Sequence, residues 1–386
     1  MNVVYLDNNA TTQVAPEVLD GMLPFLRDFW GNPSSMHSFG GSVKKHIEKA
    51  REQVASLLGA DPSEIIFTSC GTESDNTAIR GTYEALNDEK IQIITTRVEH
   101  PAVLGPCRRL KEMGANVVEI GVTNDGSLKT DEYVDALKRG KSIVSIMWAN
   151  NETGVLFPVN ELANLAKENG AIFHTDAVQA VGKIKIELKN SNIDLLSLSG
   201  HKLHAPKGIG ALYIRKGTKL QTFMIGGHQE NGRRGGTENV AGIVGLGIAC
   251  ELAQKHFEEE NTRVVNMRDR LEKEILAKCP DSMVNGNRKY RLPNTTNISF
   301  QYIEGEAILY HLSDFGIAAS SGSACTSGSL EPSHVIRAMG VPFTAAHGSI
   351  RFSLSRYNTD EEISCVIEKM PEIVQKLRNL SPFVNH

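Results

Sequence analysis

Short apolar segments alternate with helical segments along much of the chain, and this alternation limits the fold more than any other feature of the sequence. Strands that alternate with helices predict an α/β fold with a mostly parallel sheet covered by helices on both faces. Ligands of such sheets bind beyond the carboxyl ends of the strands, so residues that directly follow a strand are the first candidates for function. The predicted strands are residues 65–68, 91–95, 117–120, 143–148, 172–175 and 195–198.

The length of 386 residues and a change of pattern near residue 259 predict two domains. A long helical region over residues 240–278 is charged in its middle and is suited to connect them. Shorter strands and helices follow it. We therefore predict a large α/β domain over residues 13–258 and a smaller α+β domain that combines residues 1–12 with residues 259–386.

Composition excludes several classes of protein. The 41 basic and 45 acidic residues give a net charge of −4, without the basic excess typical of nucleic-acid binders. The longest weakly polar stretch, residues 240–250, is too short to span a membrane, and residues 1–9 do not resemble a signal peptide. The six cysteines lack paired spacing, which is typical of a reducing compartment. We expect a cytoplasmic protein without a membrane or nucleic-acid partner.

Polar groups directly follow three of the predicted strands. Residues 68–74 place a glycine turn and a helix start after a strand, which directs N–H groups at an anion such as phosphate. Serine and threonine also cap helices, so this segment alone favours a structural role. Asp176 ends an apolar strand, where a charge needs a partner, although aspartate is also a good helix cap. Lys202 lies in a turn after the next strand, where burial makes a lysine amine nucleophilic.

Two alternatives concern the segment around Lys202. His201 and His204 are potential metal ligands, but no third ligand and no cysteine pair accompanies them. Lys207 is a second candidate amine, although its Pro-Lys-Gly context is typical of an ordinary turn.

The three segments together match the needs of pyridoxal 5'-phosphate, whose phosphate needs N–H donors, whose ring nitrogen needs an anion and whose aldehyde needs an amine. His100 follows another strand and is the candidate for stacking on the ring, although the same position suits a capping or core histidine. Cys325 lies in a Ser/Gly-rich segment that has no apolar period to bury it. Beside a lysine–aldehyde site, this exposed thiol is best interpreted as a mobile nucleophile that carries sulfur.

The chain closely resembles the NifS/IscS-type cysteine desulfurases, which are pyridoxal-phosphate enzymes of the class V aminotransferase group with the type I fold. Residues 320–325 are similar to the long-loop group I, and residues 204–208 and 353–357 are more similar to the NifS branch than to the IscS branch. The resemblance covers nearly the whole chain and is carried by residues 5–12, 31–35, 68–76, 99–100, 150–154, 174–179, 199–202, 234–239 and 351–353.

This resemblance implies roles for individual residues. Lys202 would bind the cofactor aldehyde, Asp176 the ring nitrogen and Gln179 the ring hydroxyl. His100 would stack on the ring and assist proton transfer. The remaining roles fall to Gly71, Thr72, Ser199 and His201 for the phosphate, Thr237 for the phosphate of a neighbouring subunit, Asn151 for the cofactor and substrate, and Arg351 for the substrate carboxylate.

The resemblance also implies a reaction and partners. L-cysteine would yield L-alanine and a Cys325 persulfide, which a homodimeric enzyme would pass to a NifU/IscU-type scaffold for iron–sulfur cluster assembly. Cys325 would then contact a transient 2Fe-2S cluster shared with the scaffold. Three alternatives stay open: a pyridoxal-phosphate lyase or aminotransferase that acts on another amino acid, such as selenocysteine, and does not need Cys325; a non-catalytic sulfur or metal carrier; and a histidine-bound metalloenzyme.

Overall fold

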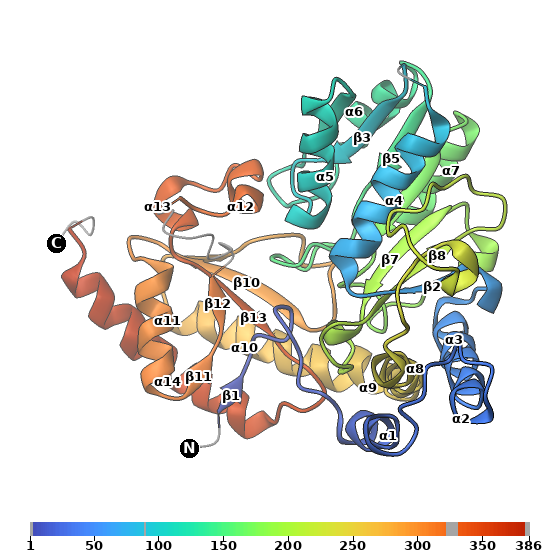
Figure 1. Ribbon diagram of the computed structural model, residues 1–386. Helices are drawn as coiled ribbons and strands as arrows, with labels where there is room; N and C mark the ends of the chain where they lie inside the picture. Colours follow the sequence, from blue (N-terminus) through green and yellow to red (C-terminus); the bar gives the residue numbers. More distant parts are fainter. Residues whose placement is uncertain (1–2, 89, 322–330, 383–386) are drawn as a thin grey trace.

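The central layer is a seven-stranded sheet in the order β2-β8-β7-β6-β5-β3-β4 (Figure 1). The structure is a computed structural model that describes residues 3–88, 90–321 and 331–382. Five of the strands run parallel, which confirms the predicted mostly parallel α/β sheet. The strands are β2 (Ile65–Thr68), β3 (Gln92–Thr96), β4 (Asn116–Ile120), β5 (Ser142–Ser145), β6 (Ile172–Asp176), β7 (Leu195–Ser199) and β8 (Gly210–Ile214).

Strand β8 was absent from the sequence-based prediction, and its orientation explains why. It pairs antiparallel with both β7 and β2. The connection from β7 to β8 holds only a short turn, whereas a parallel pair needs a long crossover, usually a helix. The alternation rule that found the parallel strands therefore does not apply to β8.

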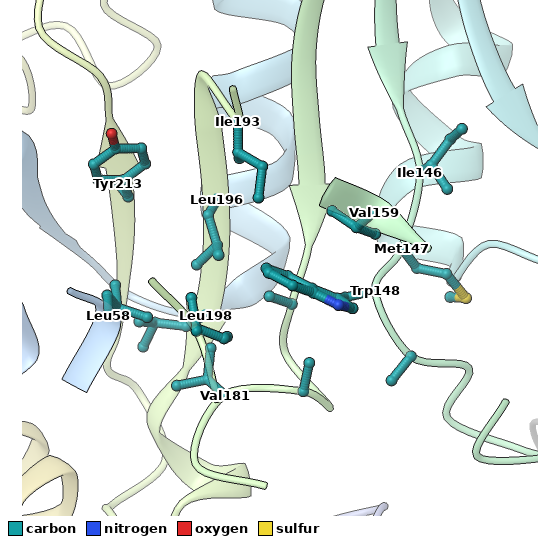
Figure 2. Packing of buried hydrophobic residues seen from close by; sticks show 14 of the residues in the cluster. Leu58, Ile146, Met147, Trp148, Val159, Val181, Ile193, Leu196, Leu198 and Tyr213 are labelled. Atoms are coloured by element: carbon teal, nitrogen blue, oxygen red, sulfur yellow. The ribbon is translucent and has the colours of Figure 1, made fainter. Parts of the chain in front are cut away.

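Helices cover both faces of the sheet. Successive side chains of a strand point to opposite faces, and both sets are buried in β3, β5 and β7. Ile93 of β3 packs with α4 and α5, while its neighbour Ile94 belongs to the larger cluster on the other face. Figure 2 shows part of that larger cluster, including Leu196, Leu198 and Trp148. The helices are α1 (Pro16–Arg27), α2 (Ser38–Gly41), α3 (Lys44–Leu58), α4 (Gly71–Leu86), α5 (Pro101–Glu112), α6 (Thr130–Leu137), α7 (Val159–Glu168) and α8 (Val240–Lys255).

A second core forms around a four-stranded sheet in the order β12-β13-β10-β9. It joins Leu6, next to β1, to Phe300 and Phe352 of this sheet. The division of the chain into two domains stays a prediction. The elements are β1 (Val4–Tyr5), β9 (Ser282–Val284), β10 (Thr295–Phe300), β11 (Ile317–Ala318), β12 (Ser320–Ser321), β13 (Ser349–Ser353), α9 (Phe257–Glu259), α10 (Val265–Lys278), α11 (Gly305–Asp314), α12 (His334–Ala338), α13 (Phe343–Ala346) and α14 (Asp360–Leu380).

Helix α12 does not pack into this second core. We call the seven-stranded sheet with its helices the first body, and the four-stranded sheet with its core the second body. Val335 and Ile336 of α12, with Met339 just after it, belong to the large hydrophobic cluster of the first body. The segment around α12 therefore bridges the two bodies. In the described part of the chain, no helix is long and apolar enough to cross a membrane.

A buried ion pair fixes the loop that precedes α8. The two guanidinium nitrogens of Arg51 lie 2.7 and 2.9 Å from the carboxylate oxygens of Glu230, and this carboxylate also accepts a hydrogen bond from the Phe67 N–H at 2.9 Å. Both charged side chains are buried. The loop that carries Thr237 is thereby joined to α3 and β2.

We expect Glu230→Ala to lower the free energy of unfolding by about 3–5 kcal/mol, because it leaves the Arg51 guanidinium buried and unpaired. Urea denaturation followed by circular dichroism measures this loss. Glu112→Ala breaks the exposed pair with Arg109 and is the matched control, with an expected loss below about 1 kcal/mol. Equal losses in the two variants would contradict the role given to Glu230.

Candidate active site

A cavity of about 620 Å³ opens at the carboxyl ends of the parallel strands. Residues from both bodies line it. The predicted phosphate-binding segment, the carboxylate of Asp176 and the amine of Lys202 therefore surround one space. Ten of the predicted site residues line this cavity: Gly71, Thr72, His100, Asn151, Asp176, Gln179, Ser199, His201, Lys202 and Arg351.

One end of the cavity is built by the start of α4 and the end of β7. A Cβ at Gly71 would lie 2.8 Å from a methyl carbon of Val178, so only glycine fits this close approach. The Ser199 hydroxyl is buried and has no hydrogen-bond partner within the described residues. Burial and the nearby Lys202 lower the pKa of His201 to about 4, so this ring is neutral at pH 7. Free N–H groups and this unused hydroxyl suit a phosphate.

Asp176 lies at the end of β6, where it is 7% exposed. Its carboxylate accepts a hydrogen bond from the Val178 N–H at 2.9 Å. Burial raises its pKa, and the charges of His100 and Lys202 oppose this effect. The side-chain oxygen of Gln179 is buried nearby without a partner among the described residues. This region therefore offers one anion and one unused acceptor.

Lys202 occupies a short helical turn directly after β7. Its Nζ donates hydrogen bonds of 2.6 Å to the carbonyl oxygens of Asn9 and Ala10. Burial, together with the positive charges of Arg351 and Lys183, lowers the pKa of Lys202 to about 7. A substantial fraction of this amine is neutral, and hence nucleophilic, at physiological pH.

Arg351 reaches the cavity from β13 of the second body. Its guanidinium donates to Asp7 at 2.6 Å and to the Asn151 carbonyl oxygen at 3.0 Å. The Nε atom of Arg351 is buried and has no partner in the described part of the chain. The guanidinium is thus held in place with donor capacity to spare, as recognition of a carboxylate requires.

His100 caps the start of α5. Its Nδ1 accepts a hydrogen bond from the Ala102 N–H at 3.1 Å. Burial lowers the pKa of His100. The capping alternative from the sequence and the functional interpretation are therefore compatible, because one ring both caps the helix and lines the cavity.

Two predicted residues are not placed in this cavity. Thr237 is exposed and does not line it, and its role at the phosphate of a neighbouring subunit stays a prediction. Its loop is tied to the start of α4 by a two-bond pair between Arg234 and Glu73, at 2.8 and 3.1 Å. Cys325 lies outside the described residues. Lys207 is exposed and lies away from the lining.

Sequence reasoning missed several residues that line the cavity. Glu152 belongs to a motif that carried the family resemblance, but the motif assigned it no role. His334 gave no signal, because nothing in its local pattern relates it to His100. Among the described residues, no group of three or more histidines, cysteines or carboxylates could hold a metal ion. The missed lining residues include Asp75, Glu152, Ser333 and His334.

Comparison with known proteins places the chain in a family. The aminotransferase class-V family matches residues 4–366. A protein named cysteine desulfurase from Trichormus azollae is 61% identical over 385 residues, covering 100% of this chain and 96% of the relative. Cysteine desulfurase NifS from Azotobacter vinelandii is 59% identical over 381 residues, covering 98% of this chain and 94% of NifS. A solved NifS-like protein superposes with a TM-score of 0.91 at 40% identity, covering 97% of this chain and 100% of that structure. From the cavity and these matches together, the chain belongs to the class-V aminotransferases, within their NifS-type cysteine desulfurases.

Proposed function

We propose that this protein removes the sulfur of L-cysteine, releases L-alanine and carries the sulfur as a persulfide on Cys325. The observation that carries the proposal is the convergence of Lys202, Asp176 and Arg351 on one cavity. A buried amine of lowered pKa, a buried anion and a braced guanidinium are the groups that chemistry on an amino acid with pyridoxal 5'-phosphate needs.

The residues present fit this cofactor. The buried Ser199 hydroxyl and the buried Gln179 oxygen lack partners within the described ranges, and a bound group with a phosphate and a ring hydroxyl would satisfy both. Lys202 would hold the aldehyde and Asp176 the ring nitrogen, with Gly71, Thr72, Ser199 and His201 around the phosphate. When bound, the cofactor supplies an acceptor for electrons from the Cα of the substrate.

The side chains of this protein then bind and orient the substrate and move its protons. Arg351 and Asn151 would hold the substrate carboxylate, and the contact of Arg351 with Asp7 limits its movement. The Lys202 amine would take the proton from the substrate Cα, for which a pKa of about 7 is well matched to neutral pH. The Cys325 thiolate would attack the substrate sulfur, so that an S–S bond forms while the substrate C–S bond breaks.

Several finer statements belong to the same proposal. The sulfur acceptor would be a NifU/IscU-type scaffold, on which Cys325 would meet a transient 2Fe-2S cluster, and the chain would act as a homodimer in which Thr237 serves the partner's site. The name NifS of one relative supports the link to iron–sulfur assembly. The five described cysteines are all free thiols, which supports a cytoplasmic location.

Mass spectrometry after addition of L-cysteine tests the proposal. We expect stoichiometric L-alanine and one extra sulfur atom on Cys325, with no adduct in Cys325→Ser. Burial raises the pKa of Cys107 and Cys250 to about 12, which makes these thiols unreactive internal controls. Sulfur on Cys70 or Cys107 would overturn the assignment of Cys325, and transamination without any adduct would favour an aminotransferase.

A further inference from the structure

The cavity contains a second imidazole, His334, for which neither the sequence nor the proposed reaction supplies a role. His334 is the first residue of α12, the helix whose apolar side packs into the core of the first body. Figure 1 shows α12 on the side of the second body that faces α5, the helix that His100 caps. The two rings therefore reach the same cavity from different elements.

Two hydrogen bonds fix the start of α12 against the cavity wall. The Nε2 of His334 lies 3.0 Å from the carbonyl oxygen of Glu99. The Ser333 hydroxyl lies 2.5 Å from a carboxylate oxygen of Glu152 and accepts from the Val335 N–H. Because a carbonyl oxygen can only accept, the Nε2 of His334 carries a proton. In the neutral ring, the Nδ1 of His334 is then a free acceptor, and no described residue donates a hydrogen bond to it.

His100 has the opposite arrangement. Its Nδ1 accepts the Ala102 N–H, so the proton of the neutral ring lies on Nε2. Protonation of Nδ1 would break the cap of α5. His100 can therefore donate a proton from Nε2, but its other nitrogen is occupied. The cavity thus holds one imidazole with an available donor and one with an available acceptor.

We propose that the Nδ1 of His334 accepts the proton of the thiol that reacts in this cavity, a step that rests on the proposed function. The S–H bond breaks, an N–H bond forms, and the electron pair stays on sulfur, so that a thiolate and an imidazolium result without oxidation or reduction. The thiol belongs either to the substrate or to the enzyme. With an ordinary thiol pKa of about 8.5, only about 3% of the thiol is ionised at pH 7. A base that removes the thiol proton can therefore raise the rate of the thiolate step about 30-fold.

Other charged groups face this region, and one of them is a rival base. Burial raises the pKa of Glu152 to about 7, although the hydrogen bond from Ser333 favours its charged form. The Glu99 carboxylate is turned away toward the Met147 N–H and Thr96. Lys202 is committed to the cofactor, and His100 lacks a free acceptor. Arg337 of α12 forms an ion pair with Glu331, which precedes this helix.

His334→Gln separates the base from the structural hydrogen bond. The glutamine amide retains a donor for the Glu99 carbonyl oxygen but has no titratable nitrogen. We expect kcat/KM for L-alanine formation to fall about 30-fold at pH 7 and to approach the wild-type value at pH 9, where the thiol ionises unaided. Cofactor absorbance and thermal unfolding of the variant establish that it is folded and loaded. Glu152→Gln is the matched control and should retain the wild-type pH profile.

Alkylation by iodoacetamide without L-cysteine identifies the thiol. The alkylation rate of the persulfide-forming thiol is measured against pH. If the midpoint of this profile shifts to higher pH in His334→Gln, the enzyme thiol is the proton donor. If the midpoint does not shift, the substrate thiol is the proton donor. A wild-type pH profile of kcat/KM in His334→Gln would overturn the inference, as would a lost pH dependence in Glu152→Gln. Failure of the wild-type enzyme to form L-alanine would instead contradict the proposed function itself.

Discussion

Replacing Lys202 with alanine is expected to lower L-alanine formation by at least about 10³-fold, because one amine both binds the cofactor aldehyde and moves the Cα proton. The structure gives this amine the required properties. Its pKa is lowered to about 7 by burial and by the charges of Arg351 and Lys183. Its Nζ donates hydrogen bonds of 2.6 Å to the carbonyl oxygens of Asn9 and Ala10, which fix its position in the cavity.

Lys207→Ala is the matched control for this prediction. Lys207 lies five residues further along the chain, is exposed and does not line the cavity. We expect its loss to leave L-alanine formation within about twofold, as for most exposed positions away from special features. Rates and the visible absorbance of the purified holoenzymes are measured together. A Lys202→Ala enzyme with near wild-type activity, or an equal loss in both variants, would refute the assignment of Lys202.

The sequence alone was sufficient to place Asp176 and Lys202 in one site, because both depend on local order. Asp176 ends β6 and Lys202 follows β7, and these strands are parallel neighbours with Asp176 opposite Ser197. The carboxyl ends of such strands meet at one edge of the sheet. A residue that ends one strand and a residue that follows its neighbour are therefore brought together by the sheet itself.

Other residues reach the cavity only through packing between distant segments. Arg351 pairs with Asp7, which is 344 residues away, and His334 contacts the backbone of Glu99, which is 235 residues away. No hydrophobic period encodes such contacts, since periodicity reports which face of an element is buried and not which element covers it. For Arg351 the role came from family resemblance, and for His334 nothing in the sequence indicated one.

A third substitution tests the anion. We expect Asp176→Asn to lower kcat/KM for L-alanine formation by about 10²–10³-fold, the cost typical of removing one preorganised electrostatic partner. Asparagine keeps an oxygen that can accept from the Val178 N–H, so the fold of this turn should persist while the charge is lost. Without the anion the ring nitrogen of the cofactor has no partner that keeps it protonated.

The neighbouring Asp75 should not replace the missing charge. It is 1% exposed, and burial, which persists when Asp176 is replaced, raises its pKa well above the ordinary value and so disfavours a charge at this position. Asp194→Asn is the matched control, because Asp194 is also an aspartate of raised pKa, yet it binds the Phe173 N–H at the opposite end of the strands. If Asp194→Asn impaired catalysis as much as Asp176→Asn, the loss would reflect general damage to the sheet. If Asp176→Asn retained wild-type kcat/KM, the Asp176 carboxylate would have no part in the reaction. Asp75 would then be the remaining candidate for the anion that partners the ring nitrogen.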